Sequence, residues 1–560
     1  MEASKEPDLV TMRTESQGAD FDLVVVGAGF SGLYMLHRAR QLGFRTRVFE
    51  AGDEVGGTWY WNRYPGARCD SESVYYMLSD RASEDILQEW NWSERFAGQP
   101  EIWAYLKFVA DKLDLRRDIQ FNTRISAAHW DEQSQLWRLT TAVGEQVSAR
   151  FFISAVGCLS TANIPEIPGL ESFQGRWLHT GQWPHEPVSF AGRRVAVIGT
   201  GATGVQVVPE VAKEAAQVYV FQRTPNFDIP GHNHPLEASE IEEIKRNYRN
   251  LWERTRQTGF GMPFEAAERS TFSVSPEERQ QIYEGAWTQG GFHVGLDTFN
   301  DLLFDQEAND SIAEFVRTKI RETVKRPEVA EWLAPKDHAF FTKRPPLEHG
   351  YYQAFNRDNV ALINLRQTPI EKITAQGIQT RDQEFQVDDI IFATGFDAMT
   401  GTLFRIDIRG RAGLALKEAW QDGPKTYMGL AAHGFPNMFM ITGPQSPSVL
   451  TNMPVAIEQH VDWIADCLVY LREHGLAYIE ADEEAQERWV AIAAQIAELT
   501  LLSKTDSWWR GANIPGKPRL LYPYVGGLNN YRVACDEVAA KGYEGFALRA
   551  SAAPASSLQT

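Results

Sequence analysis

Two glycine-rich runs in the chain have the spacing that binds dinucleotide phosphates. The first run is Gly27-Ala28-Gly29-Phe30-Ser31-Gly32. In such a run the first glycine permits a tight turn, the second lets the backbone approach a pyrophosphate, and the third lets a helix pack closely on a strand. Glu50 follows at roughly the 20-residue distance where a carboxylate binds ribose hydroxyls. We therefore expect this run and Glu50 to bind a dinucleotide with free ribose hydroxyls, such as FAD.

The second run, Gly199-Thr200-Gly201-Ala202-Thr203-Gly204, repeats the pattern without the acidic residue. Gln222-Arg223-Thr224 stands where Glu50 stands after the first run. A carboxylate there would repel a 2′-phosphate, whereas an arginine pairs with it through charge-assisted hydrogen bonds. The second run therefore predicts an NADPH site, with Arg223 at the 2′-phosphate.

Each run needs a strand before it and a helix after it to present its backbone to a phosphate. The apolar run Phe21–Val26 predicts a buried strand, and a helix over 33–41 and a strand over Thr46–Phe49 follow. Residues 194–223 repeat this plan. Two such units predict an α/β protein with two Rossmann-like dinucleotide-binding domains, one for FAD and one for NADP.

The rest of the chain divides around these two units. Apolar residues recur at helical spacing between about 230 and 335, which predicts a helical insertion. A late strand over 390–392, followed by Ala393-Thr394-Gly395, is expected to return to the flavin domain. The expected parts are 20–157 and 385–548 for the FAD domain, 158–190 for a connector, 191–229 and 336–384 for the NADP domain, 230–335 for the insertion and 549–560 for a disordered tail.

The composition is that of a soluble, folded protein that does not bind nucleic acid. The 55 Lys and Arg against 74 Asp and Glu among 560 residues give a net charge of −19, which repels nucleic-acid phosphates and anionic membranes. No apolar run approaches the roughly 18 residues of a membrane span, and no signal peptide is evident. We therefore expect a cytoplasmic location. The sequence does not define the oligomeric state, and a monomer is the expectation.

A third segment, Gly56-Gly57-Thr58-Trp59, supports a flavin because its glycines would let the backbone approach the cofactor. Reduced flavin can reduce a disulfide, pass electrons onward or react with dioxygen. The four cysteines contain no closely spaced pair and no zinc or iron–sulfur spacing; they are Cys69, Cys158, Cys467 and Cys535. A disulfide reductase and a metal site are therefore not expected, and oxygen chemistry is left.

The connector carries a longer motif, Phe173-Gln-Gly175-Arg-Trp-Leu-His179-Thr-Gly-Gln-Trp183-Pro184. It matches the fingerprint FxGxxxHxxxW(P/D) of type I Baeyer–Villiger monooxygenases. The chain resembles this family from about residue 20 to 548 and is similar above all to its phenylacetone and steroid monooxygenase branch. The runs at 64–70 and 511–517 and Ser507-Trp508 support that branch.

The resemblance implies that NADPH reduces FAD and that dioxygen adds to the flavin C4a carbon. The resulting peroxyflavin attacks a ketone, and rearrangement gives an ester or lactone. Negative charge develops in this reaction, so a fixed cation beside the peroxide is required. The family pattern places Arg344 in that role, with Asp70 holding it in place, and both also belong to the cofactor site. It adds Lys343 and Thr224 to the 2′-phosphate site and Gly57, Thr58, Trp59, Tyr76 and Trp508 to the cofactor-binding residues.

Two parts of the pattern need a separate interpretation. His179 is expected to have a structural or conformational role rather than to act as a general base, and Trp183 to pack. Pro345 and Pro346 follow Arg344 where relatives usually have other apolar residues, so the wall of the substrate pocket is expected to differ. The loop 446–450 matches one that lines the pocket.

Two alternatives stand beside a ketone monooxygenase. A heteroatom oxygenase would use the same flavin to make N-oxides or sulfoxides, and sulfoxidation is expected as a side activity in either case. A non-catalytic NADPH-sensing protein would keep both dinucleotide folds but lose the cation at Arg344 or the fingerprint. Both features are intact in this sequence.

Overall fold

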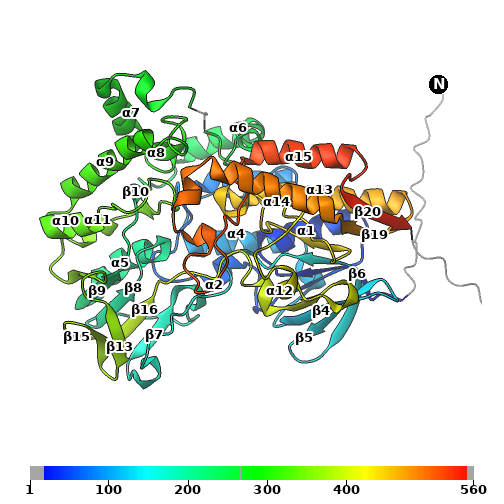
Figure 1. Cartoon of the computed structure of the whole chain (residues 1–560), viewed down its shortest axis with the longest axis horizontal. Coiled ribbons are helices and arrows are strands. Elements are labelled where there is room, and N and C mark those ends of the chain that lie inside the picture. Colours follow the sequence, from blue (N-terminus) through cyan, green and yellow to red (C-terminus); the bar gives the residue numbers. More distant parts are fainter. Residues whose placement is uncertain (1–17, 265–266, 551–560) are drawn as a thin grey trace, which may run out of the picture.

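The computed structural model describes residues 18–264 and 267–550, which form two sheet-based units and a helical subdomain (Figure 1). The first sheet has strand order β17-β4-β5-β6-β1-β2-β3, and β18 also pairs with β6. Its strands are β1 (Phe21–Val26), β2 (Thr46–Phe49), β3 (Ile119–Gln120), β4 (Ile125–Asp131), β5 (Leu136–Thr141), β6 (Gln146–Ser154), β17 (Asp407–Arg409) and β18 (Met438–Met440).

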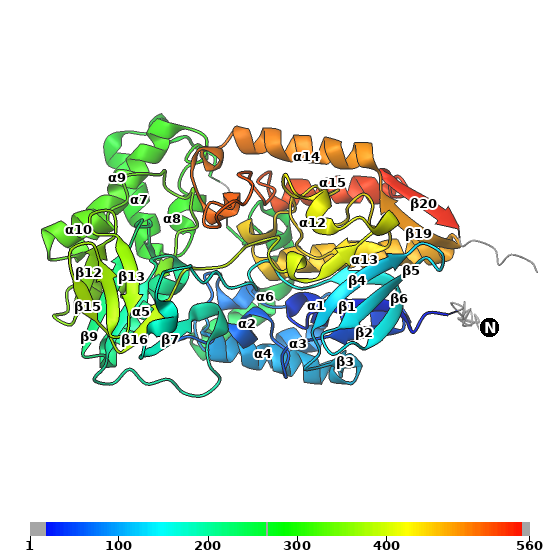
Figure 2. The ribbon, with the colours of Figure 1, turned by 60° about the horizontal axis from the view of Figure 1, so that its bottom comes forward.

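The helices of the first unit are α1 (Phe30–Gln41), α2 (Thr58–Trp61), α3 (Glu84–Glu89), α4 (Gln99–Lys112), α12 (Leu416–Ala419), α13 (Met453–Glu473), α14 (Glu483–Glu498) and α15 (Leu528–Ala540). Figure 2 shows α14 and α15 at the top of the molecule and α3 and α4 near its bottom. Most helices of the first unit share a hydrophobic cluster with Leu23 and Val25 of β1, whereas α12 belongs to the cluster on the opposite face of that strand. An antiparallel pair, β19 (Leu476–Ala481) and β20 (Phe546–Ala550), closes this unit.

The second sheet is entirely parallel, with order β12-β9-β8-β16-β7. Its strands are β7 (Arg176–His179), β8 (Arg194–Ile198), β9 (Gln217–Gln222), β12 (Val360–Asn364) and β16 (Asp389–Phe392). Helices α5 (Ala202–Glu214) and α11 (Tyr351–Ala354) pack beside it, and β13 (Ile370–Thr374), β14 (Gly377–Thr380) and β15 (Glu384–Gln386) form a small antiparallel sheet.

The expected helical insertion is present and forms the upper left of Figure 1. It contains α6 (Ala238–Gln257), α7 (Pro276–Gln289), α8 (His293–Leu296), α9 (Gln306–Thr323) and α10 (Pro327–Leu333), and the pair β10 (Ile229–Pro230) and β11 (Leu347–Glu348) closes it at its base. Helix α7 begins with a proline after Ser275, whose side chain accepts from the Glu278 N–H, and Asp305 caps α9 in the same way.

Strands β1 and β8, which lead into the two glycine runs, are buried on both faces, as is typical of parallel strands inside a sheet. In β1, Leu23 and Val25 belong to one hydrophobic cluster, whereas Val24 and Val26 belong to another on the opposite face. The apolar, β-branched runs that predict these strands are therefore explained by burial on both sides. Among the described residues, no helix has the length and apolar character needed to span a membrane.

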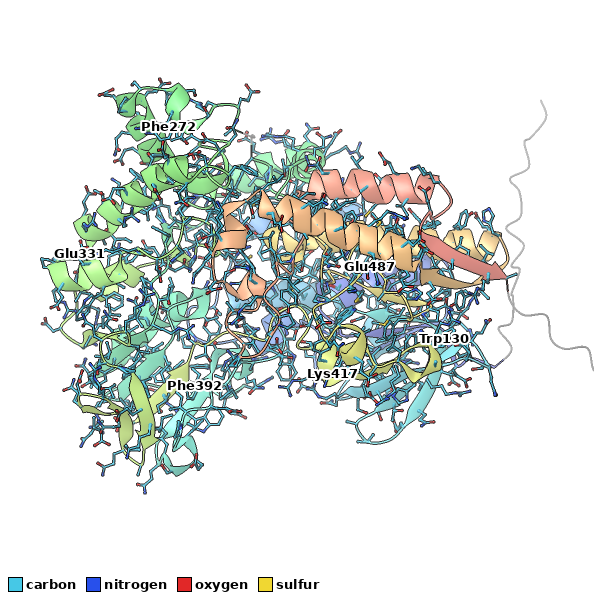
Figure 3. The ribbon with its side chains drawn as sticks, in the orientation of Figure 1. Trp130, Phe272, Glu331, Phe392, Lys417 and Glu487 are labelled. Carbon is cyan, nitrogen blue, oxygen red and sulfur yellow. The ribbon has the colours of Figure 1, made fainter. Side chains whose placement is uncertain are left out.

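The assignment of the late strand to the flavin domain was wrong. Strand β16 pairs with β8 through Asp389–Val195 and with β7, so it lies in the second sheet. Figure 3 shows Phe392, at its end, on the opposite side of the molecule from Trp130 of the first sheet. The chain returns to the first sheet only at β17 and β18. The connector also contributes to the second sheet, through β7.

The expected tail begins later than predicted. Residues 549 and 550 belong to β20, where Arg549 is paired with Tyr478. Residues 551–560 of the expected tail lie outside the described residues. Helix α1 also begins at Phe30, three positions before the expected start, because its first turn directly follows the glycine run.

Candidate active site

The first glycine run has the geometry that its residues predict. Gly27 has φ +105°, and a Cβ there would lie 2.5 Å from the Ala155 carbonyl oxygen. A Cβ at Gly32 would lie 1.8 Å from the Gly27 carbonyl oxygen, so only glycine lets the helix pack this closely. Gly29 faces Gly57, with 3.3 Å between its virtual Cβ and the Gly57 Cα. The start of α1 is thus left as a bare backbone surface that suits a phosphate.

Glu50 lies at the end of β2 and is buried. Its carboxylate accepts hydrogen bonds from the backbone N–H groups of Ala28 and Gly52, both at 2.7 Å. Burial raises the pKa of Glu50, and these backbone donors oppose the rise. A carboxylate can accept about four hydrogen bonds, so Glu50 can hold the glycine loop and still accept from ribose hydroxyls.

The second run repeats the first run's geometry. Gly199 has φ +111°, with its virtual Cβ 2.4 Å from the Ala393 carbonyl oxygen, and the Cβ of an alanine at Gly204 would meet the Gly199 oxygen at 2.2 Å. Ala393, after β16, therefore stands where Ala155 stands after β6. By contrast, apart from the adjoining residues of the chain, no atom of the described residues lies within 4 Å of a Cβ built on Gly201. This open position gives the loop room for a ligand.

Two cations gather beside the second run. Arg223 follows β9 and is exposed, and Lys343 is partly buried. Burial lowers the pKa of Lys343, Arg223 lowers it further and Asp337 opposes both. Within the described residues, neither cation has a hydrogen-bond or ion-pair partner. Thr200 Oγ1 donates to the Thr224 carbonyl at 3.0 Å and so ties this segment to the glycine loop. The two like charges, close together and unpaired, suit a phosphate.

Arg344 is held by three hydrogen bonds. Its Nε and Nη2 donate to the two carboxylate oxygens of Asp70 at 2.6 and 2.8 Å, and Nη1 donates to the Val449 carbonyl at 2.7 Å. The guanidinium also lies 5.0 Å from the ring centroid of Phe292. Burial lowers the pKa of Arg344, but the Asp70 carboxylate outweighs burial and the net shift is upward. The result is an oriented cation with a permanent charge.

The predicted aromatic residues of the flavin site come together near this cation. Trp59 Nε1 donates to the Tyr76 hydroxyl at 3.2 Å, and the rings of Phe30 and Tyr76 meet edge to face at 5.5 Å. Burial raises the pKa of Tyr76 well above its usual range, so the hydroxyl stays protonated. Residues from the first glycine run, from α2 and from the segment after Asp70 thus share one cluster.

His179 is a buried structural residue. Its Nδ1 accepts from the Gly181 N–H at 3.0 Å, and Nε2 lies 3.4 Å from Thr394 Oγ1. Burial lowers the pKa of His179 to about 4, so the ring is neutral at pH 7. The expectation that Trp183 packs is confirmed, because it is buried with its ring 6.2 Å from that of Phe190.

Trp508 is partly buried at the edge of a cluster that draws on four segments. The cluster includes Cys158 of the connector, Met399 after β16 and Val449, whose carbonyl binds Arg344. The structure therefore brings Trp508 and the loop 446–450 to the same region as Arg344.

Asn226, which was not among the predicted site residues, fixes the backbone of Arg344. Its Nδ2 donates to the Arg344 carbonyl at 3.0 Å. No residue pattern marks it; the only signal is its place three positions after Arg223. Pro345 and Pro346 are buried and lead into β11, whose start they fix because the Ile229 N–H donates to the Pro346 carbonyl.

Comparison with known proteins agrees with this geometry. A family model described as flavin-binding monooxygenase-like matches residues 21–230. The chain is 42% identical over 539 residues to a Baeyer–Villiger monooxygenase of Pseudooceanicola batsensis, covering 96% of this chain and 98% of that protein. It is also 42% identical over 531 residues to a phenazine N-monooxygenase of Lysobacter antibioticus, covering 94% and 97%.

A solved structure of an oxidized steroid monooxygenase bound to NADP is 48% identical, with a TM-score of 0.91, and the match covers 95% of this chain and all of that one. Such identity over nearly the whole length extends well beyond the glycine runs that unrelated dinucleotide-binding proteins share. It confirms the resemblance seen in the fingerprint, and the chain belongs to the Baeyer–Villiger monooxygenase family of flavoproteins.

Proposed function

We propose that this enzyme uses FAD, NADPH and dioxygen to convert ketones into esters or lactones, with oxidation of sulfides as a side activity. The observation that carries the proposal is the fixed guanidinium of Arg344, held by Asp70 and by the Val449 carbonyl. Bound FAD supplies the redox group that takes hydride from NADPH and then activates dioxygen.

The protein's part in the reaction is electrostatic. Negative charge develops on oxygen when a nucleophile adds to a ketone, and a preorganised cation lowers the energy of that charge without having to reorganise. Arg344 meets this requirement because Asp70 accepts from its Nε and Nη2 while the Val449 carbonyl accepts from Nη1. Asp70 thereby acts as a positioning residue, since it orients the cation.

NADPH binding would rest on the second glycine run and the neighbouring cations. Gly201 leaves open space where a pyrophosphate can approach the backbone. Arg223 and Lys343 would bind the 2′-phosphate together with Thr224, because both cations lack a carboxylate partner within the described part of the chain. Glu50 offers a carboxylate at the first run, where FAD carries free hydroxyls.

A second candidate function is oxygenation at nitrogen or sulfur. The similarity to a phenazine N-monooxygenase favours it, because that relative is as similar to this chain as the Baeyer–Villiger relative is. Arg344 and its partners serve either chemistry. The difference lies in whether the substrate offers an electrophilic carbonyl or a nucleophilic heteroatom.

Product analysis decides between the two. The FAD-loaded enzyme would be given NADPH, air and linear, cyclic, aromatic or steroidal ketones, and parallel reactions would contain a sulfide or a tertiary amine. We expect ketone products that are one oxygen atom heavier and that hydrolyse as esters. If ketones raise NADPH consumption no further than the background rate while amines raise it strongly, the ketone proposal is refuted.

A further inference from the structure

The segment 505–517, which we name the late loop, is tied at its start to the segment that carries the catalytic cation. Thr505 Oγ1 donates to Thr342 Oγ1 at 2.9 Å, and both side chains are buried. Thr342 lies two residues before Arg344. This hydrogen bond fixes the beginning of the late loop beside the active site.

The end of the late loop is tied to a different part of the chain. Lys517 Nζ donates to Asp397 Oδ1 at 2.6 Å and to the Ala398 carbonyl at 2.5 Å. Only 8% of the Lys517 side chain is exposed. Asn513 Nδ2 donates to the Phe396 carbonyl at 2.7 Å. A lysine with so little exposure must be paired, because burial otherwise disfavours its charge.

These partners lie on the segment 393–398, which we name the crossing segment because the chain there leaves the second sheet after β16 and goes on toward β17 of the first. The connector contacts the crossing segment too. His179 Nε2 lies 3.4 Å from Thr394 Oγ1, and Thr394 Oγ1 donates to the Asn163 carbonyl at 2.5 Å. His179 of the family fingerprint and the late loop therefore contact the same short segment of the chain.

Trp508 lies between the two anchors. It packs at the edge of the cluster that contains Ala398, Met399 and Val449. Val449 in turn holds Arg344 through its carbonyl. The position of Trp508 relative to the cation is thus set by where the late loop is fixed at both of its ends.

We propose that Lys517 is a positioning residue. Its contacts with Asp397 and the Ala398 carbonyl hold the late loop in a fixed position relative to the crossing segment, and this keeps Trp508 over the active site. The inference rests on the proposed function, since Trp508 matters only if it is one of the cofactor-binding residues that the family resemblance implies. A movement of the NADP-binding unit would reach Trp508 through the crossing segment.

The test uses the full-length, FAD-loaded enzyme with and without NADP⁺. Lys517→Met removes the charge but keeps the length of the side chain, Lys517→Arg keeps the charge, and Asp397→Asn removes the opposite charge. Lys541→Met is the matched control, because Lys541 pairs with Glu544 on the surface and is 60% exposed. Amide hydrogen exchange over residues 505–517 is measured first, and then the share of oxidised NADPH that ends as hydrogen peroxide in the presence of a ketone.

We expect exchange in the late loop to become about tenfold faster in Lys517→Met and in Asp397→Asn, since each loses a charge-assisted hydrogen bond. The double variant should exchange no faster than Lys517→Met alone, because that change already removes the contact with Asp397. The share of peroxide should rise in the same variants, and Lys517→Arg should restore both quantities toward those of the wild type.

If amide exchange over residues 505–517 in Asp397→Asn is as slow as in the wild type, the inference is overturned. This test remains valid even if Lys517→Met fails to bind FAD. Faster exchange with an unchanged share of peroxide would overturn it as well. The exchange measurement needs no ketone turnover, so its result is separate from that of the proposed function. A wild-type enzyme that makes no ester refutes that function whatever the loop does.

Discussion

Replacing Asp70 by asparagine should separate the orientation of the catalytic cation from the binding of the cofactors. The carboxylate accepts two hydrogen bonds from Arg344, at 2.6 and 2.8 Å, and the side chains are 24% and 21% exposed. Removing one partner of a fully buried pair costs about 3–5 kcal/mol, and hydrogen bonds to charged groups contribute about 1.5–3 kcal/mol each.

The partial exposure of both side chains and the remaining amide oxygen reduce this cost. We therefore expect the cation to lose about 2 kcal/mol of its stabilisation of the developing charge, which corresponds to roughly 30-fold in rate. Arg344 should keep its charge and its bond to the Val449 carbonyl. It should lose the constraint that the Asp70 carboxylate places on Nε and Nη2. The defect should therefore appear in oxygen transfer rather than in folding.

The assay has two halves. Without oxygen, rapid mixing with NADPH measures the bleaching of the flavin, and we expect Asp70→Asn to change that rate far less than 30-fold. With oxygen and a ketone, ester and hydrogen peroxide are measured together, and peroxide should replace the missing ester. Arg344→Ala should show the same pattern more strongly, with ester formation abolished.

A matched control distinguishes this result from a general loss of stability. Asp80 pairs with Arg256 at 2.8 Å, and the two side chains are 29% and 16% exposed, but within the described part of the chain no hydrogen bond or ion pair links either residue to Arg344. Asp80→Asn should lower the melting temperature by a similar amount without affecting the ester yield. Ester formation at the wild-type rate in Asp70→Asn, or equal losses of ester in both variants, would refute the role assigned to the pair.

Three further predictions follow from the two dinucleotide loops and from a buried carboxyl group. Arg223→Ala should raise the KM for NADPH much more than that for NADH, and equal effects would remove the 2′-phosphate argument. Gly201→Ala should leave the melting temperature unchanged and weaken NADPH binding, whereas Gly204→Ala should destabilise the fold, because its Cβ would meet a backbone oxygen at 2.2 Å; a thermal melt and an NADPH titration of each variant check this. Burial raises the pKa of Glu458 from 4.5 to about 7, so this carboxyl holds a proton in the fold that the unfolded chain releases. The stability that the fold gains from binding this proton is fully present below pH 4.5 and is lost as pH rises through about 7. Glu458→Gln should therefore gain stability over the wild type by up to about 3 kcal/mol between pH 5 and 8, and a constant difference in melting temperature across that range would contradict it.

Local sequence patterns predicted the parts of the site that are made of backbone. Each glycine run is contiguous, and the roles of its residues follow from the absence of a side chain, so the strand, turn and helix around Gly27 and Gly199 could be predicted. Glu50 and Arg223 could be placed because the strand after each loop ends at a fixed distance from it. These predictions need only one βαβ unit.

The late strand was misplaced because its neighbours are not local. Strand β16 lies between β7, which comes from the connector, and β8, which begins the second unit. Ala393 and Ala155 occupy equivalent places against the two glycine loops. Ala393-Thr394-Gly395 resembles Ala155-Val156-Gly157, which follows β6. This resemblance was a signal that β16 has the same place in the second sheet as β6 has in the first.

The pair of Asp70 and Arg344 lay beyond local reasoning, since the two residues are 274 positions apart. The family resemblance proposed both residues, and the structure shows that they are bonded to each other. It also explains why two basic residues stand side by side in an acidic protein. Lys343 interacts with Arg223 and has no carboxylate bonded to it in the described structure, whereas Arg344 is bonded to Asp70.

Under the proposed function, the backbone at Lys343 and Arg344 would serve both NADPH binding and oxygen transfer. A 2′-phosphate bound at Lys343 would act on the residue next to the catalytic cation, while Asn226 ties the same backbone to the end of the segment that begins with Arg223. Correct binding of the nicotinamide cofactor would consequently help to hold Arg344 in place. The phosphate site and the oxygen-transfer site would thus be coupled directly through adjacent residues, without a large movement of the protein.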